Sequence, residues 1–221
     1  MILKIRKVLS PEQVSHVRRA AERIGFVDGR LTNAGSSVKN NLQVSQNDPA
    51  AAEPGMILRD ALFQHPDLRH FAYPRNMARP TVSVYRPGMA YGWHVDEALF
   101  PSQPPMRSDL SCTVFLSDPD TYEGGELVIQ LGQEQLSYKL PAGDAIVYPS
   151  TTIHQVTPVT RGERMVGITW MQSYVQDVQR RELLHQLDEA RAIEHARSPD
   201  PRMQVLLESL RTNLFRMWSD N

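Results

Sequence analysis

The chain has 221 residues, of which 41% are apolar and 22% are charged, and its formal net charge is −1. This composition suits a folded domain with a sizeable core and excludes a disordered chain. The near balance of 24 basic and 25 acidic residues predicts no electrostatic attraction to nucleic acid or to an anionic membrane surface.

The first third of the chain, residues 1–78, predicts helices joined by extended and irregular pieces. Ser10 and Pro11 are typical of a helix start, and Gly25 of a helix stop. In chain order we predict a strand over 2–9, a helix over 11–24, a loop over 28–48 with an extended piece at 41–45, a helix over 55–64 and a helical turn at 66–71.

From Arg79 onward the pattern changes to short apolar runs separated by glycine and proline, which is typical of a barrel or a double-layer jelly roll. The predicted strands cover 81–85, 91–96, 110–116, 126–131, 135–140, 145–148, 153–159 and 164–174. Residues 98–108 contain three prolines and no apolar period, so we expect a loop there that covers a substrate.

From Gln176 onward the apolar period is helical. One stripe is formed by Leu183, Leu187 and Ala190, and another by Met203, Leu206, Leu207, Leu210, Leu214 and Met217. The break between them is predicted at residues 198–201. Such stripes are packing faces, which either cover the core or form a homo-oligomer interface, and the sequence does not choose between the two.

The cysteine count and the first residues bear on where the protein works. Cys112 is the single cysteine, which excludes an internal disulfide and fits a reducing compartment. Residues 1–9 lack the apolar stretch of a signal peptide, and no run approaches the roughly 18 apolar residues of a membrane span. We therefore expect a soluble, cytoplasmic protein without nucleic-acid or membrane partners.

Three residues form a candidate metal site. His94 and Asp96 are two apart, a spacing that directs both side chains to one face of a strand. With His154 from a distant strand they would give two imidazoles and one carboxylate, which is the ligand set of non-haem Fe(II) oxygenases. A buried His–Asp hydrogen bond is the common alternative for an isolated pair of this kind.

The context of the pair adds a family resemblance. The stretches that carry it are residues 38–43, 85–96, 123–127, 141–150 and 154–164. They resemble the Fe(II)- and 2-oxoglutarate-dependent dioxygenases of the prolyl-hydroxylase superfamily, and the whole chain is similar to a bacterial PKHD-type hydroxylase, a group associated with iron uptake. The resemblance implies a double-stranded β-helix (jelly roll) flanked by N-terminal and C-terminal helices, an α+β fold with a mainly β core. It also implies Fe(II), 2-oxoglutarate and L-ascorbate dependence.

If this resemblance holds, residues 1–78 pack on the core, residues 79–175 form the dioxygenase unit and residues 176–221 are a helical extension.

Arg164 lies ten positions after His154, and by strand alternation it shares an inward face with Val166, Ile168 and Trp170. We expect Arg164 to bind the distal carboxylate of 2-oxoglutarate, because a planar guanidinium can donate two parallel hydrogen bonds.

Other residues near this face leave alternatives open. Tyr85 either donates its hydroxyl to the same carboxylate or packs in the core, and Trp170 is expected to pack beside the cosubstrate. Arg161 is the alternative to Arg164 for this role, but it precedes Gly162 in a predicted turn. Trp93 should point away from the metal, and Tyr91 either lines the entrance or packs.

The predicted activity is hydroxylation of an unidentified substrate, a peptidyl residue or an iron-uptake-related small molecule. Dioxygen is consumed, and 2-oxoglutarate is oxidatively decarboxylated to succinate and CO2. One alternative is a cupin-like metalloenzyme that does not use 2-oxoglutarate, and an inward-facing Arg164 argues against it. The other is a non-catalytic regulator that responds to iron or 2-oxoglutarate.

Overall fold

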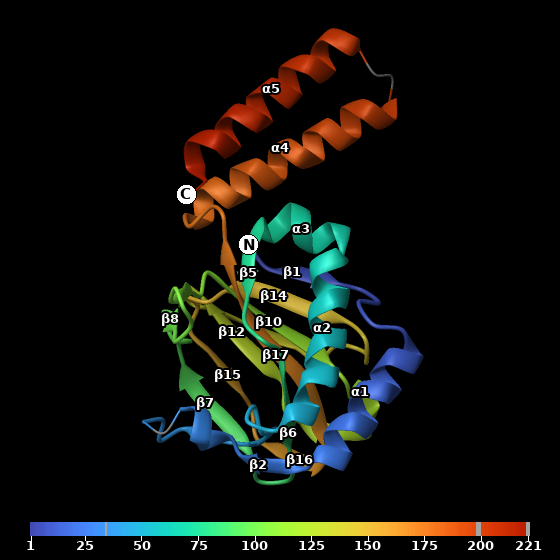
Figure 1. The fold of residues 1–221 in the computed structure, drawn as a ribbon, viewed down its shortest axis with the longest axis vertical. Helices are drawn as coiled ribbons and strands as arrows, with labels where there is room; N and C mark the ends of the chain where they lie inside the picture. The colour runs from blue at the N-terminus through green and yellow to red at the C-terminus, as the bar shows by residue number, and fades with distance from the viewer. Residues whose placement is uncertain (34, 198–199, 220–221) are drawn as a thin grey trace.

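Two antiparallel β-sheets face each other and form the body of the protein (Figure 1). The computed structural model describes residues 1–33, 35–197 and 200–219. The larger sheet has eight strands in the order β1-β14-β10-β17-β6-β4-β2, with β5 also paired to β17, and the smaller has five in the order β13-β12-β15-β7-β3. This is the layered β core with helices at both ends of the chain that the sequence predicts.

The bounds of the elements follow in chain order. The strands of the larger sheet are β1 (Leu3–Ile5), β2 (Phe26–Asp28), β4 (Leu42–Val44), β5 (Pro74–Met77), β6 (Thr81–Tyr85), β10 (Leu110–Phe115), β14 (Ala145–Pro149) and β17 (Arg164–Ser173). Those of the smaller sheet are β3 (Lys39–Asn40), β7 (Ala90–His94), β12 (Leu127–Leu131), β13 (Glu134–Tyr138) and β15 (His154–Val156). Two separate pairs are β8 (Leu99–Phe100) with β9 (Met106–Arg107), and β11 (Tyr122–Gly124) with β16 (Val159–Gly162). The helices are α1 (Pro11–Ile24), α2 (Ala52–Gln64), α3 (Pro66–Ala72), α4 (Val178–Arg197) and α5 (Pro201–Trp218).

The core has two layers. Helices α1, α2 and α3 cover one face of the larger sheet (Figure 1), and the buried side chains there include Val17, Leu58 and Leu62. The other face of the larger sheet meets the smaller sheet through Phe115, Ile129 and other buried side chains. The candidate functional residues lie in this second layer, which keeps them away from the covering helices.

Helix α1 shows how local sequence sets an element. Ser10 and Gln13 form a capping box, Pro11 occupies the first turn, and Gly25 ends the helix at φ +85°. Val14 and Val17 are buried on the face that packs against the larger sheet. The predicted helix over 11–24 is therefore confirmed in its bounds and in its buried face.

Several short strands were missed, because their residues lack a period of their own. Strands β2, β5 and β11 were not predicted, and residues 98–108 contain the hairpin β8–β9 rather than a loop alone. The single strand predicted over 153–159 is wrong, because the chain leaves the smaller sheet after Val156 and β16 pairs with β11 instead. Apart from the hairpin β8–β9, each of these elements is stabilised by a partner strand more distant in sequence.

The C-terminal helices form an antiparallel hairpin that stands off the body (Figure 1). Helix α4 ends at Arg197 and α5 begins at Pro201, and the first two residues of the predicted break, 198 and 199, lie outside the described residues. Neither stripe predicted from the sequence is fully buried. Only Leu187, Leu207 and Leu214 are partly covered, and the other stripe residues are exposed.

The structure also bears on membrane insertion. Within the described ranges, none of the helices combines the length and the apolar character that crossing a lipid bilayer requires.

Candidate metal centre

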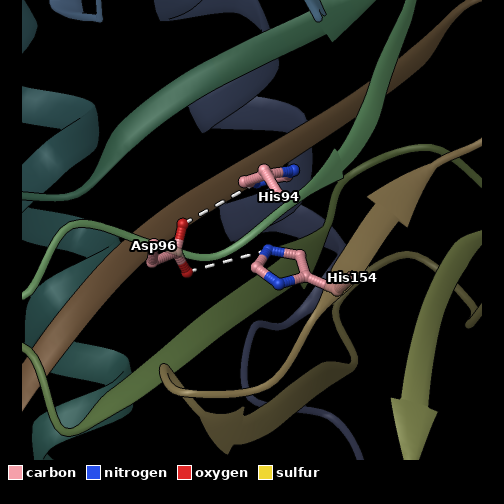
Figure 2. Close-up of side chains that lie close together, drawn as sticks. All are labelled: His94, Asp96 and His154. Atoms are coloured by element: carbon pink, nitrogen blue, oxygen red, sulfur yellow. Dashed lines mark ion pairs between the residues drawn. The ribbon is translucent and has the colours of Figure 1, made fainter. Parts of the chain in front are cut away.

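Strand pairing brings the two predicted histidine ligands together. Strands β7 and β15 are antiparallel neighbours in the smaller sheet, and His94 and His154 are register partners across them. The strand predicted over 91–96 ends at His94, so Asp96 lies beyond it in a segment without strand pairing. The expectation that strand alternation aims Asp96 was wrong, yet the chain after β7 still directs its carboxylate at the two imidazoles (Figure 2).

The three side chains form a compact set of donor atoms. His94 Nε2 lies 3.8 Å from Asp96 Oδ1, and His154 Nε2 lies 3.7 Å from Asp96 Oδ2. One ligand atom from each residue lies within 4.8 Å of the others, the one such group among the described residues. Bonds of about 2 Å to a shared ion are compatible with these separations. Two imidazoles and a carboxylate are suitable ligands for a divalent transition metal, and they leave the other coordination positions of the ion open.

The imidazoles are held in the tautomer that a metal requires. Nδ1 of His94 lies 2.7 Å from the carbonyl oxygen of Gly92, and Nδ1 of His154 lies 2.9 Å from that of Thr152. Since a carbonyl only accepts, each Nδ1 carries the proton and each Nε2 presents its lone pair to the centre. Burial, followed by the proximity of His154, lowers the pKa of His94 well below its ordinary value, so that imidazole is neutral at pH 7.

The carboxylate of Asp96 is oriented by a serine that the sequence analysis missed. Ser111 on β10 donates its hydroxyl to Asp96 Oδ2, and the Ser150 hydroxyl lies 2.8 Å from that of Ser111. A signal was present in the sequence, because Ser111 and Thr113 alternate with apolar Leu110 and Val114 and give β10 a polar face toward the pocket.

We expect Ser111→Ala to weaken divalent-metal binding by about 10–100-fold, because Asp96 would lose the group that orients it. Ser150→Ala should have a smaller effect, since Ser150 contacts Ser111 and not the carboxylate. Calorimetric titration of Mn(II) into each variant measures this. Ser137→Ala, on exposed β13, is the matched control, and an unchanged affinity in Ser111→Ala would contradict the positioning role.

Arg164 lies at the other end of the same pocket, where β17 pairs with β6 and places it opposite Tyr85. Its side chain is only 1% exposed, and its Nε and Nη1 have no hydrogen-bond partner among the described residues. The guanidinium instead lies 5.0 Å from the Tyr85 ring centre and 5.7 Å from that of Phe115. A buried cation with unused donors is costly, so this arrangement suits an anion supplied from outside the chain.

A glycine makes room for this arginine. Gly125 has φ +67°, and a Cβ there would lie 2.9 Å from both Cδ of Arg164 and Cγ2 of Val159. Any side chain at this position would therefore displace the arginine stem as well as strain the backbone. Gly125, which lies in the stretch 123–127 that carries the family resemblance, thus has a steric role beside Arg164.

Two aromatic residues line the pocket between the metal-binding triad and Arg164. Burial raises the pKa of Tyr85 to about 12, with Arg164 opposing the shift, so its hydroxyl stays protonated and can donate. Trp170 has a buried Nε1 without a hydrogen-bond partner in the described part of the chain, and its ring lies 4.6 Å from that of Phe100 in β8. Both residues are therefore placed to contact a ligand that fills the pocket.

The remaining predicted residues lie apart from the pocket or at its edge. Trp93 is 39% exposed, and Arg161 is exposed and pairs with Glu123 at 2.9 Å. Tyr91 stacks on His94, with ring centres 3.5 Å apart and planes 9° apart. Lys39 was not singled out from the sequence. Its side chain is buried, and its Nζ lies 5.6 Å from the centre of the Tyr91 ring. Burial lowers the pKa of this amine.

A much larger cavity, of about 1130 Å³, lies between the helical hairpin and the body. It is lined by residues such as His70, His185 and Glu208 and contains none of the triad residues. By size alone, that cavity would be the first candidate for a functional site. The chemistry of the lining residues favours the pocket between the sheets. A three-residue ligand set lies at one end of it, and at the other lies a buried guanidinium with two donors that lack partners in the described part of the chain.

Comparison with known proteins agrees with this site. The family model of the 2OG-Fe(II) oxygenase superfamily matches residues 80–172, which include His94, His154 and Arg164. A PKHD-type hydroxylase of Sphingopyxis alaskensis is 45% identical over 98% of this chain and 99% of its own. A PKHD-type hydroxylase of Maricaulis maris is 42% identical over the full length of both chains.

Solved structures share the fold at low sequence identity. A prolyl hydroxylase from Trichoplax adhaerens, in complex with a peptide fragment of the hypoxia inducible factor oxygen degradation domain, matches with a TM-score of 0.61 at 14% identity. The match covers 77% of this chain and 82% of that one. A Pseudomonas putida prolyl-4-hydroxylase matches with a TM-score of 0.52 at 20% identity, over 78% and 92% of the two chains.

Proposed function

Because the chain belongs to the PKHD-type hydroxylases of the 2OG-Fe(II) oxygenase superfamily, we propose that it hydroxylates a substrate with 2-oxoglutarate and dioxygen as cosubstrates. The products from 2-oxoglutarate are succinate and CO2. The primary substrate is a peptidyl residue or an iron-uptake-related small molecule, the two classes that the family resemblance suggests.

The observation that carries this proposal is the buried guanidinium of Arg164, whose Nε and Nη1 have no partner among the described residues, at the opposite end of a pocket from His94, Asp96 and His154. 2-Oxoglutarate has a chelating 2-oxo acid at one end and a carboxylate at the other. A triad that binds iron and an arginine that binds a carboxylate match its two ends. A metalloenzyme without this cosubstrate has no use for a cation buried in this position.

The residues of the chain then have distinct roles. His94, Asp96 and His154 bind Fe(II), and Ser111 fixes the orientation of Asp96. Arg164 binds the distal carboxylate through its planar fork, with Tyr85 donating its hydroxyl, and Trp170 packs beside the bound molecule. Fe(II) with 2-oxoglutarate and dioxygen supplies the oxidising chemistry when bound, while the pocket excludes water and orients the reactants. L-Ascorbate is expected to sustain turnover by keeping iron reduced.

The organisation of the chain fits these roles. We assign catalysis to residues 79–175, which supply every proposed ligand, with residues 1–78 packed on this unit and residues 176–221 as a helical extension. Cys112 is buried and unpaired, and burial raises the pKa of its thiol to about 12. An inert thiol and the absence of a disulfide in the described chain are compatible with the cytoplasmic location that we propose.

An anaerobic titration tests the function directly. Fe(II) followed by 2-oxoglutarate should produce the metal-to-ligand absorption band of a chelated 2-oxo acid, and candidate substrates that bind beside the metal should perturb it. Admission of dioxygen should then yield succinate. A band without any succinate would favour a regulator that senses iron or 2-oxoglutarate, and neither band nor succinate would reject 2-oxoglutarate as the cosubstrate.

Residues 98–108 are proposed to cover the pocket. Their hairpin β8–β9 places Phe100 against Trp170, at the pocket wall, and Ser108 holds the base of the hairpin by donating to the carbonyl of Glu97. Binding of Mn(II) and 2-oxoglutarate should slow amide hydrogen exchange over 98–108, because a filled pocket gives Phe100 and Trp170 a further surface to pack on.

Hydrogen exchange followed by mass spectrometry measures this protection, and Phe100→Ala should reduce it. Strand β13 at the far edge of the smaller sheet serves as the internal control. Equal exchange over 98–108 with and without these ligands, and with every substrate that supports succinate formation, would rule out the covering role.

A further inference from the structure

The hairpin of α4 and α5 is attached to the body only at its base (Figure 1). The contact includes a small cluster in which Tyr73, Val175 and Leu184 are buried and Leu214, Phe215 and Trp218 are partly buried. Beside it, the Tyr73 hydroxyl donates to Asp188, and the ring centres of Phe71 and His185 lie 5.7 Å apart. Helix α5 has no buried residue, and the buried residues of α4 are Arg181 and Leu184, near its start. Most of the hairpin therefore presents its side chains to solvent.

The outer face of α5 has the spacing of a helix-packing seam. Met203, Leu206, Leu210 and Met217 follow one another at intervals of three, four and seven residues, and all four are exposed. Their exposed fractions lie between 44% and 72%. Intervals of three, four and seven keep side chains on one stripe and are the pattern by which helices pack side by side.

Helix α4 repeats the same spacing. Leu183, Gln186, Ala190, Ile193 and Arg197 are again three and four apart, and all five are exposed. Leu183 and Ile193 are each 53% exposed. Two antiparallel helices with matching stripes would form a continuous apolar face if both stripes point to the same side of the hairpin.

The cavity beneath the hairpin indicates that the stripes of α4 and α5 point to the same side of the hairpin. Asp188 of α4 and Glu208 of α5 both line the cavity between the hairpin and the body. Residues two positions apart lie about 200° apart around a helix. Ala190 is therefore nearly opposite Asp188, and Leu210 nearly opposite Glu208, so both stripes face away from the body.

We propose that this outer face is the interface of a homodimer, in which the hairpins of two copies pack as a four-helix bundle. A pair of antiparallel helices with seam spacing is completed by another pair with the same spacing, and a second copy supplies one. Contiguous exposed apolar patches on proteins in solution mark interaction sites. The proposal rests on the hairpin alone and is independent of the proposed catalytic function.

The charges at the edges of the face determine how the two copies are arranged. Glu182 lies on the edge of α4 that is remote from α5, and Arg202 and Arg216 lie two heptads apart on the far edge of α5. The ion pair between Arg191 and Glu208 sets the register of the hairpin and brings Glu182 level with the turn that contains Arg216. A two-fold axis parallel to the helices places α4 against the partner copy's α5, acidic edge against basic edge. The perpendicular axis would place like charges together.

Sedimentation equilibrium of the full chain tests the dimer. The wild type should have twice the 25.1 kDa mass of one chain. Leu206→Glu and Leu210→Glu should each weaken self-association by more than about tenfold, as expected for apolar residues at the centre of an interface. Val205→Glu is the matched control, because Val205 is 69% exposed on the same helix but lines the cavity on the inner side.

Charge reversal tests the arrangement of the two copies. Glu182→Arg and Arg216→Glu should each weaken the dimer, and the two changes combined should restore part of the loss. Circular dichroism and the melting temperature establish that each variant folds. A monomeric or trimeric wild type, a dimer that only Val205→Glu dissociates, or a double variant weaker than both single variants would overturn the proposal.

Discussion

Replacing His154 by alanine is expected to abolish iron-dependent turnover and to reduce divalent-metal affinity by more than about 100-fold. Loss of groups that merely orient metal ligands already costs 10–100-fold, and His154 is expected to be a ligand. Its Nε2 is aimed at Asp96 and its Nδ1 is fixed by the carbonyl of Thr152. The same result is expected for His94→Ala and for Asp96→Asn.

Asp96→Asn separates loss of metal from loss of fold, because it preserves shape and can still accept the hydrogen bond from Ser111. Metal content by elemental analysis and the metal-induced rise in melting temperature should both vanish, while the melting temperature without metal stays close to that of the wild type. His16→Ala is the control, since His16 is a half-buried histidine paired with Glu53 on the covering helices. Full activity or one bound ion per chain in His154→Ala would reject the assigned ligand set.

Arg164→Ala is expected to lower the affinity for 2-oxoglutarate by some tens-fold to a few thousand-fold, with little change in iron binding. Leaving a buried carboxylate without its charged partner costs about 2–5 kcal/mol, and about 1.4 kcal/mol corresponds to a factor of ten. Arg164→Lys should recover only part of the affinity, because one ammonium cannot reproduce the planar fork of donors. Calorimetric titration of 2-oxoglutarate into the anaerobic Fe(II)-loaded variants measures these effects.

Two further variants make this result specific. Arg161→Ala should be nearly silent, because Arg161 is exposed and its pairing with Glu123 lies at the surface. Arg164→Met preserves the stem beside Gly125 and removes a buried cation whose Nε and Nη1 have no partner among the described residues. It should therefore leave the melting temperature of the ligand-free protein unchanged or higher while lowering the affinity for 2-oxoglutarate as much as Arg164→Ala does. Wild-type affinity in Arg164→Ala would reject 2-oxoglutarate as the ligand of this pocket.

The sequence was informative where a local rule acts within a few residues. The capping box at Ser10 predicted α1, and alternation along residues 164–170 correctly predicted that Arg164 lies inside. It failed for short strands such as β5 and β11, which depend on partners distant in the chain. It also failed for Asp96, which lies beyond the end of β7 and is oriented by Ser111 rather than by strand alternation.

The sequence by itself determined the residue types that the chemistry needs, the family that they resemble and the layered β core, because motif spacing and apolar period are local properties. Only the tertiary structure decided how these residues meet. Pairing of β7 with β15 makes His94 and His154 neighbours, and pairing of β6 with β17 buries Arg164 beside Tyr85. The direction in which the C-terminal stripes face was likewise undetermined, because helical period defines a face but not what it packs against. Contacts between distant segments depend on how sheets and helices pack in three dimensions, which no short stretch of sequence specifies.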